Sequence, residues 1–172
     1  MPNINTLSSG NEDTTYSVFT IGALKLAIDR QSIHSIETIL DMKPLDSETA
    51  SDAIATIHFN TQIIPVFALN EELSIVSTLP ETRRACLLFK SENNQPYGIA
   101  VDTITALDTK THESQAIPAC MLTEQSPVIN VLREDDNFIG ILNSQLLKEL
   151  LNTDLFYSDQ IPTNELTGVS HA

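Results

Sequence analysis

The sequence predicts a mainly β fold, and two observations support this prediction. Short apolar runs recur along the chain, separated by turn residues about every eight to twelve positions. Two of these runs, Ile63–Leu69 and Tyr97–Ile104, read as buried strands and carry no obvious catalytic group. Many short strands in succession are typical of small barrels or of a sandwich, and the pattern alone does not decide between them.

The first predicted element is an antiparallel hairpin near the N-terminus. Tyr16–Ile21 reads as a strand, and in Leu24–Asp29 large apolar residues occupy every second position. This period of two marks a half-buried strand. Gly22-Ala23 lies between the two runs, and glycine tolerates the positive φ that a tight turn requires. We therefore expect the two strands to pair directly.

The next region shows a helix-like pattern. Apolar residues at helical spacing lie at the start of this region: Ile33, Ile36, Ile39 and Leu40. Isoleucine also favours strands, so both states stay open here. Pro44 ends this segment. A short helix is then expected at about 47–57, with Asp46 or Ser47 as its N-cap. Its apolar face would consist of Ala50, Ala53, Ile54 and Ile57.

The remainder of the chain predicts further strands and one helix. The strands are expected at 63–69, 83–90, 97–107, 128–133 and 137–142. Polar residues at 92–96 and 134–136 indicate hairpin turns, and the second of these lacks the residues of a calcium loop. Ser144 opens a helix whose apolar residues are Leu146, Leu147, Leu150 and Leu151.

Composition limits the domain and its core. Residues 1–13 and 153–172 are polar and predict two tails, although Leu155–Tyr157 can still pack back. One domain over residues 14–152 remains, and a chain of 172 residues can bury enough surface to be stable without metal or disulfides. Aromatic residues make up 5% of the chain and Trp is absent, so we expect an aliphatic core.

The charge of the chain restricts its partners. There are 23 acidic and 9 basic residues, which gives a formal net charge of -14. Such a charge repels nucleic acid and anionic lipids, so neither is expected as a partner. A basic protein surface is a more natural partner, although the charge can equally serve solubility alone. The sequence has no secretory signal and no apolar run of membrane-spanning length, so we expect a cytoplasmic protein without membrane insertion.

No set of residues resembles a catalytic or metal site. Cys86 and Cys120 form no CxxC or Cys/His cluster and the four histidines are scattered, so we expect no metal. The five glycines form no phosphate-binding loop, so we expect no cofactor. Asp102 is interpreted as a strand-end carboxylate that accepts backbone hydrogen bonds. We therefore expect that the protein is not an enzyme.

Four apolar runs follow one another along the chain: Phe19–Ile28, Ile63–Leu69, Tyr97–Ile104 and Phe138–Asn143. In this order and spacing they resemble the CheW-like domain, the adaptor module of bacterial chemosensory arrays, over roughly residues 15–151. The resemblance implies two small SH3-like β-barrel subdomains with a few short helices, packed across an aliphatic interface. It also implies a protein that works by binding other proteins.

Two motifs of the family are only partly kept. The family segment Val-x-Glu-Ile aligns with Ile33–Ile36, where Ser35 replaces Glu. The family segment Asn-Leu-Arg-Gly aligns with His58–Thr61, where Asn and Thr replace Arg and Gly. An asparagine has neither the charge nor the reach of arginine. In the strand that follows, Ala68 replaces a family Asp. The resemblance is therefore stronger for the fold than for receptor coupling.

The resemblance also implies two protein-binding surfaces. A kinase-binding face would belong to the first subdomain, and its two isoleucines are equally consistent with the core. A receptor groove would lie between the subdomains, and its two apolar members are more consistent with the core than with contact. The candidate protein-binding residues are Ile33, Ser35, Ile36, Asn60, Thr61, Ile99 and Val101.

The resemblance implies a non-catalytic adaptor of a chemosensory system. Its expected partners are the regulatory domain of a CheA-like histidine kinase, and receptor tips or other CheW-like proteins. The changed motifs also allow an accessory pathway, such as one that governs twitching motility and type IV pili. A second hypothesis keeps the fold but gives the module a partner other than a chemoreceptor. A third is a small enzyme or ligand-binding protein.

Overall fold

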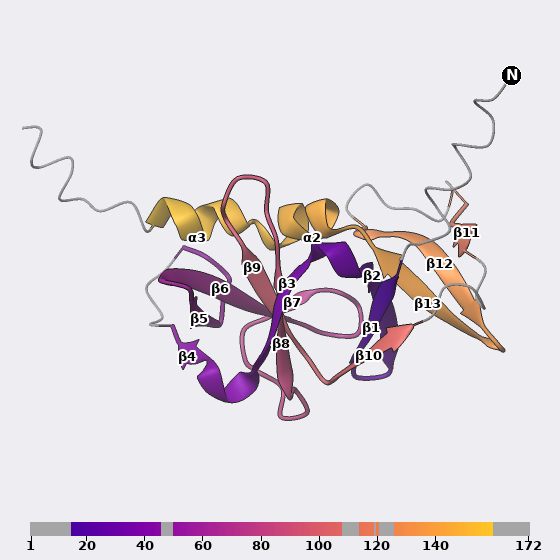
Figure 1. The fold of residues 1–172 in the computed structure, drawn as a ribbon, viewed down its shortest axis with the longest axis horizontal. Coiled ribbons are helices and arrows are strands. Elements are labelled where there is room, and N and C mark those ends of the chain that lie inside the picture. The colour runs from indigo at the N-terminus through magenta and orange to yellow at the C-terminus, as the bar shows by residue number, and fades with distance from the viewer. Residues whose placement is uncertain (1–14, 46–49, 108–113, 119, 121–125, 160–172) are drawn as a thin grey trace, which may run out of the picture.

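The computed structural model describes residues 15–45, 50–107, 114–118, 120 and 126–159 (Figure 1). Two curled sheets lie side by side and each forms a half-barrel, so the predicted mainly β fold is confirmed. The first sheet has the strand order β10 (Thr103–Leu107), β1 (Tyr16–Ile21), β2 (Leu24–Asp29), β13 (Asn137–Leu142), β12 (Val128–Glu134) and β11 (Ser114–Ala116).

The second sheet is built from the segment between β2 and β10. Its strand order is β3 (Ile33–Thr38), β8 (Ala85–Phe89), β9 (Tyr97–Val101), β6 (Gln62–Leu69), β5 (Ala55–Phe59) and β4 (Lys43–Pro44), and the short β7 (Ile75–Val76) pairs with β6. Two short 3-10 helices flank β3, namely η2 (Arg30–Ser32) and η3 (Ile39–Asp41). Most neighbours are antiparallel, but β2–β13 and β6–β9 are parallel.

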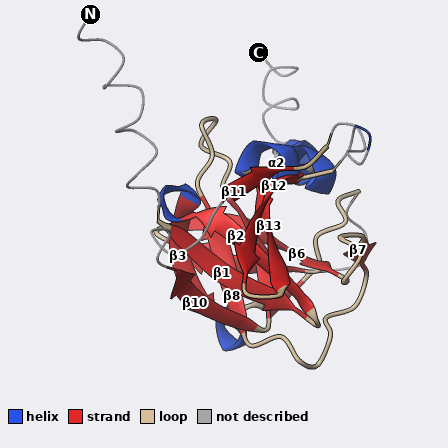
Figure 2. Cartoon of the chain, turned by 90° about the vertical axis from the view of Figure 1, so that its right-hand side faces the viewer, coloured by secondary structure: helices blue, strands red, loops and turns tan. Residues whose placement is uncertain are grey.

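Two short helices close the described chain. Helix α2 spans Ser144–Leu151 and α3 spans Thr153–Asp159. Figure 1 shows both on the same side of the sheets, and Figure 2 shows α2 there from a second direction. The α2 helix begins where sequence predicted it, with the Asn143 side chain accepting a hydrogen bond from the Leu146 N–H. Helix α3 lies in the segment expected to be a tail, and its Phe156 is 1% exposed. None of the helices in the described segments is both long and apolar enough to cross a membrane.

The N-terminal hairpin agrees with the prediction. Strands β1 and β2 pair in register from Tyr16 opposite Asp29 to Ile21 opposite Leu24. Gly22 has a φ of 58° while the φ of Ala23 is not positive, which fits a two-residue turn of type II′. The positive φ is the reason that glycine is needed here, because a Cβ at Gly22 would meet only the end of the exposed Glu71 side chain, which can move away.

The helix expected at 47–57 is wrong over residues 50–57, and residues 46–49 lie outside the described part. Residues 50–54 contain no helix, and Ala55–Phe59 is strand β5, paired antiparallel with β6. Ala53, Ala55 and Ile57 also fit a period of two, and pairing with the apolar β6 decides between the two patterns. The open choice for the preceding region resolves as a strand, β3, followed by η3.

The segment expected as one strand at 97–107 is two strands. Residues up to Val101 belong to β9 in the second sheet, and residues from Thr103 belong to β10 in the first. Asp102 is the crossing point, and its N–H donates to the carbonyl of Thr20 at 2.9 Å. This crossing carries the chain from one half-barrel to the other.

Three apolar cores result from this arrangement. One lies inside the first half-barrel, one inside the second, and the largest joins the facing sides of the two sheets to the helices. The largest fully buried side chains of this joint core are aromatic: Phe19, Phe67, Phe89, Tyr97 and Phe156. Most residues of the joint core are nonetheless aliphatic, as the composition predicted, and the few aromatic residues gather among them.

A buried ion pair fastens the two sheets together at the crossing point. Arg83 is 5% exposed, and its Nη1 lies 2.7 Å from Asp102 Oδ1. The other carboxylate oxygen, Oδ2, accepts a hydrogen bond from the Gly22 N–H at 2.8 Å. The Thr82 hydroxyl donates to Oδ1 at 3.0 Å, and Arg83 Nη2 donates to the Leu69 carbonyl at 2.7 Å. One carboxylate thus connects the turn of the first sheet to two segments of the second.

The pKa of Asp102 reports the strength of these contacts. Partial burial acts to raise it, but the hydrogen bonds from Arg83, Gly22 and Thr82 and the charge of Arg83 together lower the pKa below its ordinary value of 3.8. A carboxyl whose pKa is lowered by folding contributes stability above its ordinary pKa. That contribution is lost as the pH falls through the folded-state pKa.

We predict that Asp102→Asn lowers the free energy of unfolding at pH 7 by about 3 kcal/mol, because it leaves the buried Arg83 without a counter-charge. Urea unfolding between pH 7 and pH 3 measures this. The difference from the parent should begin to shrink as the pH drops below 3.8 and continue to shrink through the lower folded-state pKa, where the folded parent carboxylate also becomes protonated. Asp135→Asn at an exposed turn is the control, and a gap for Asp102→Asn that does not change with pH would contradict the prediction.

Candidate partner-binding surface

The candidate residues fall on three parts of the second sheet. Strand β3 carries Ile33, Ser35 and Ile36, the β5–β6 turn carries Asn60 and Thr61, and β9 carries Ile99 and Val101. The resemblance assigned the first group to the first subdomain. In the structure β3 pairs with β8 and forms one edge of the second sheet.

Strand β3 presents its two isoleucines differently. Ile36 is 52% exposed, which makes it available to a partner. Ile33 is half-buried and packs against the joint core. The two residues are three positions apart on a strand whose burial alternates from residue to residue, so they lie on opposite faces. Since β3 has a sheet neighbour on one side only, its outer edge and Ile36 form an exposed apolar element.

An acidic residue that sequence reasoning missed lies beside Ser35. The Ser35 hydroxyl donates a hydrogen bond to the carboxylate of Glu37, two positions further along the same strand. Residues two apart on a strand point to the same face. A negative charge is therefore present on β3 even though the family Glu at position 35 is absent. The sequence could have indicated this acidic residue, because Glu37 lies two positions after Ser35 and a strand places such residues on the same face.

Glu37 also affects the buried thiol on the neighbouring strand. Burial, followed by the charge of Glu37, raises the pKa of Cys86 to about 12. The thiol is therefore protonated at neutral pH and is a poor nucleophile. Its side chain packs in the core of the second half-barrel, as expected for a small buried residue.

The β5–β6 turn has both central residues at positive φ. Asn60 has a φ of 48° and Thr61 a φ of 67°, and both are exposed. Two such residues between paired strands are characteristic of a type I′ turn. Asparagine tolerates this region of backbone space, but a β-branched threonine is strained in it. The family glycine at this position would carry no such strain.

The two candidate residues on β9 are not at the surface. Ile99 and Val101 are both 0% exposed and belong to the joint core between the sheets. Their side chains support the fold from within and are not available to a partner. The sequence analysis considered them more consistent with the core than with contact, and the structure agrees.

The structure brings β3 and the β5–β6 turn to the same end of the second sheet. The His34 and Phe59 rings meet edge to face with centroids 4.9 Å apart. The side-chain amide of Gln62 donates to the Asn94 carbonyl at 3.1 Å, which links the turn to the loop between β8 and β9. The start of β3 and the changed Asn60–Thr61 turn therefore border one continuous surface.

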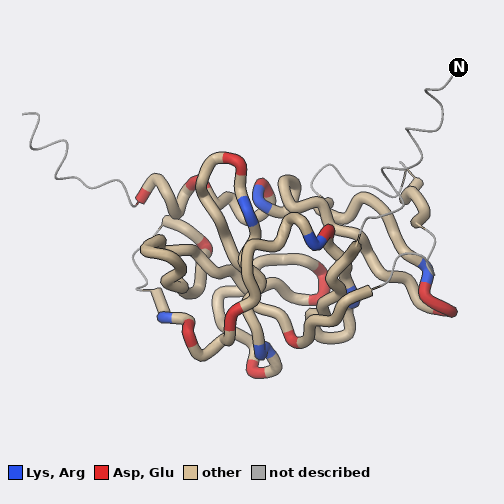
Figure 3. Tube along the Cα trace, viewed as in Figure 1, with Lys and Arg blue, Asp and Glu red and all other residues tan. Residues whose placement is uncertain are grey.

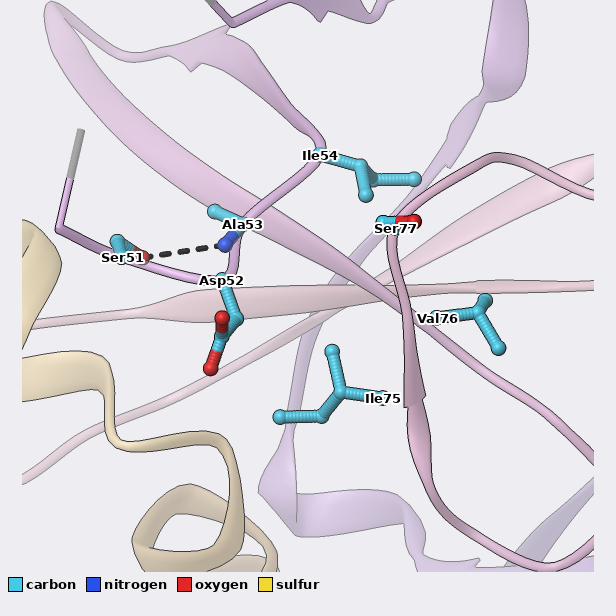
Figure 4. A pocket seen from close by; sticks show the side chains of 7 residues that line it. All are labelled: Ser51, Asp52, Ala53, Ile54, Ile75, Val76 and Ser77. Atoms are coloured by element: carbon cyan, nitrogen blue, oxygen red, sulfur yellow. Dashed lines mark hydrogen bonds between the residues drawn. The ribbon is translucent and has the colours of Figure 1, made fainter. Parts of the chain in front are cut away.

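Two neighbouring pockets lie at another part of the second sheet. The first, of about 290 Å³, lies between residues 51–54 and β7, and Asp52 and two serines are among the residues that line it (Figure 4). The second, of about 280 Å³, shares Ile54 and Ser77 with the first but is mainly apolar. We call the second pocket the η3 socket. Its apolar lining is Ile39, Met42, Pro44, Ile54, Ala55 and Leu79.

Several exposed apolar side chains were missed by the sequence analysis. Leu40 on η3 is 87% exposed, and Leu79 at the η3 socket is 40% exposed. Phe138 on β13 is 61% exposed and lies far along the sequence from β3. No periodic pattern distinguishes these residues from core residues, so the sequence alone gave no signal for them.

Charged residues are dispersed over the surface rather than gathered into a basic patch (Figure 3). The β12–β13 turn is acidic, and Glu134 beside it pairs with Lys25 at 2.8 Å. Among the residues that the structure describes, no group of three or more His, Cys, Asp or Glu side chains is placed to hold a metal ion. The exposed residues on β3 and around η3 are thus candidates for protein contact rather than for metal binding.

Comparison with known proteins decides the family. A model of the CheW-like domain family matches residues 15–150. This chain belongs to the CheW-like domain family. The solved structure of the scaffolding protein TtCheW from Thermoanaerobacter tengcongensis has a similar fold, with a TM-score of 0.58 at 18% identity, covering 78% of this chain and 86% of that chain. A comparison with curated proteins gave no match.

The resemblance drawn from the sequence is therefore confirmed, and with it the scaffold and adaptor character of the family. The CheW-like fold here has the two curled sheets, the joint core and the helices α2 and α3 described above. Partners specific to this chain do not follow from a structural likeness at 18% identity, which shows the fold alone.

We predict that Thr61→Gly raises the free energy of unfolding by about 1 kcal/mol, because glycine adopts positive φ without the strain of a β-branched side chain. Thermal or urea unfolding measures the gain. Asn60→Gly is the matched control and should gain less, since asparagine tolerates the left-handed region. A loss of stability in Thr61→Gly would show that the threonine side chain makes a contact that outweighs its backbone strain.

Proposed function

We propose that this CheW-like chain is a non-catalytic adaptor that links the regulatory domain of a CheA-like histidine kinase to chemoreceptor tips or to other CheW-like proteins. The observation that carries the proposal is the free edge strand β3, which presents Ile36 at 52% exposure. An exposed apolar side chain on a strand with a free edge is a suitable anchor for a protein partner.

The charge of the chain supports a protein partner with basic groups. At a net charge of -14, the chain attracts cationic surfaces and repels nucleic acid. The protonated Cys86 thiol and the structural role of Asp102 leave neither residue suited to nucleophilic or acid–base chemistry. These features support an adaptor rather than an enzyme, and we propose that it acts in the cytoplasm.

A second candidate function keeps the adaptor role but replaces the receptor by another protein. It is favoured by Asn60, which lacks the charge of the family Arg, and by Ala68, which is 0% exposed where the family has Asp. The same changes are consistent with an accessory chemosensory pathway, such as one for twitching motility and type IV pili. Affinity capture from an extract of the source organism distinguishes these partners.

We predict that Ile36→Asp weakens binding to the kinase regulatory domain by at least about thirtyfold, because it places an unpaired carboxylate at the contact. Isothermal titration calorimetry with the purified regulatory domain measures the affinity. The variant should stay folded, because more than half of the Ile36 side chain is already in solvent.

Ile33→Asp is the matched control on the same strand. Ile33 packs against the joint core, so this variant should lose about 2–4 kcal/mol of unfolding free energy. If Ile36→Asp remains folded and binds the regulatory domain as the parent does, the kinase does not dock on β3.

We predict that Asn60→Arg strengthens association with a receptor tip by about tenfold if receptor coupling is retained, since it restores a charged five-donor group at the turn. Co-sedimentation with receptor-containing membranes measures the change. Asn60→Gln, which extends the side chain without charge, is the control. No gain from Asn60→Arg would favour the partner other than a chemoreceptor.

A further inference from the structure

A protruding leucine and an apolar pocket adjoin on η3. Leu40 is 87% exposed, the most of the large apolar side chains whose exposure the structure describes. Its sequence neighbour Ile39 and nearby Met42 line the η3 socket. We propose that the η3 socket binds Leu40 of a second copy of this chain, so that two chains form a two-fold symmetric dimer with each Leu40 in the socket of its partner.

The position of the leucine favours a second copy as the occupant. In a two-fold interface the same patch is used on both chains, so the patch must be complementary to itself. A protruding side chain directly beside a pocket meets this condition, because a rotation of 180° about an axis near η3 places each leucine over the opposite pocket. A pocket without an adjoining protrusion would not be complementary to itself.

The lining of the η3 socket fits a leucine. Six apolar residues surround a volume of about 280 Å³, which is enough for one leucine side chain. The neighbouring pocket of similar size carries the Asp52 carboxylate and two serines, which would cost free energy to desolvate against an apolar group. Of the two pockets, the η3 socket is therefore the one that a leucine side chain would occupy.

The charges at the patch are also complementary to themselves. Asp41 and Lys43 are both exposed and flank Met42. With the two-fold axis passing close to Met42, Asp41 of one chain lies near Lys43 of the other, and the reciprocal pair forms at the same time. Opposite charges two residues apart suit such a dimer better than they suit a partner of uniform charge.

Sedimentation equilibrium of the full chain at about 0.15 M salt, where exposed charges act over only about 8 Å, tests the proposal. The parent should show a concentration-dependent monomer–dimer equilibrium. Leu40→Ser should weaken dimerisation by at least about a hundredfold, because symmetry removes the buried side chain twice. Phe138→Ser, which removes an exposed aromatic side chain from the other sheet, should leave the equilibrium unchanged. A parent that stays monomeric overturns the proposal, and so does a dimer that Leu40→Ser leaves intact.

A charge exchange gives a second readout that does not depend on removing an apolar contact. Asp41→Lys and Lys43→Asp should each weaken the homodimer, because like charges then face one another across the two-fold axis. An equimolar mixture of these two variants should form heterodimers, since every facing pair is again of opposite charge. The double variant Asp41→Lys/Lys43→Asp should dimerise as the parent does. Failure of the mixture to associate more strongly than either variant alone overturns the assigned geometry.

Discussion

The contact between Asp102 and Arg83 is the constraint on which the rest of the structure depends. It lies where the chain passes from the second sheet to the first, and it gathers donors from both. A buried pair of this kind adds little stability over an apolar alternative, but it strongly penalises any arrangement that separates its members. Its role is therefore to fix how the two half-barrels sit against each other.

The joint core depends on that fixed placement. Once the sheets are aligned, the aromatic side chains of both sheets and of α3 meet in a single apolar layer. Tyr97 belongs to this layer and still satisfies its hydroxyl, which donates to the Ser144 carbonyl at 2.6 Å, and burial raises its pKa. Because the facing sides of the two sheets are buried in the joint core, partners can contact only the strand edges and the outer parts of the sheets. Strand β3 and η3 belong to these accessible parts.

The sequence predicted the parts of the fold that depend on local pattern. The β1–β2 hairpin follows from alternation and from Gly22, and the burial of Ile99 follows from a continuous apolar run. The helix at 47–57 failed because Ala53 and Ile57 satisfy helical and strand periods alike, and pairing with a distant strand decided between them. The link between Arg83 and Asp102 was not predictable from one sequence, since only the crossing brings them together. For the candidate site, the sequence found β3 and the β5–β6 turn but could not rank exposure, so Leu40 was missed and Val101 was included.

The second sheet is an insertion within the first. Residues 33–101 form it completely, while the first sheet combines strands from before and after this segment. During synthesis on a ribosome, the second half-barrel can therefore assemble as soon as β9 has emerged. The β1–β2 hairpin must wait for β10 and then for β13, and β13 begins more than a hundred residues after the hairpin does. Until then, the apolar faces of the β1–β2 hairpin can pack only against the completed second half-barrel. The second half-barrel therefore acts as a template on which the first sheet forms.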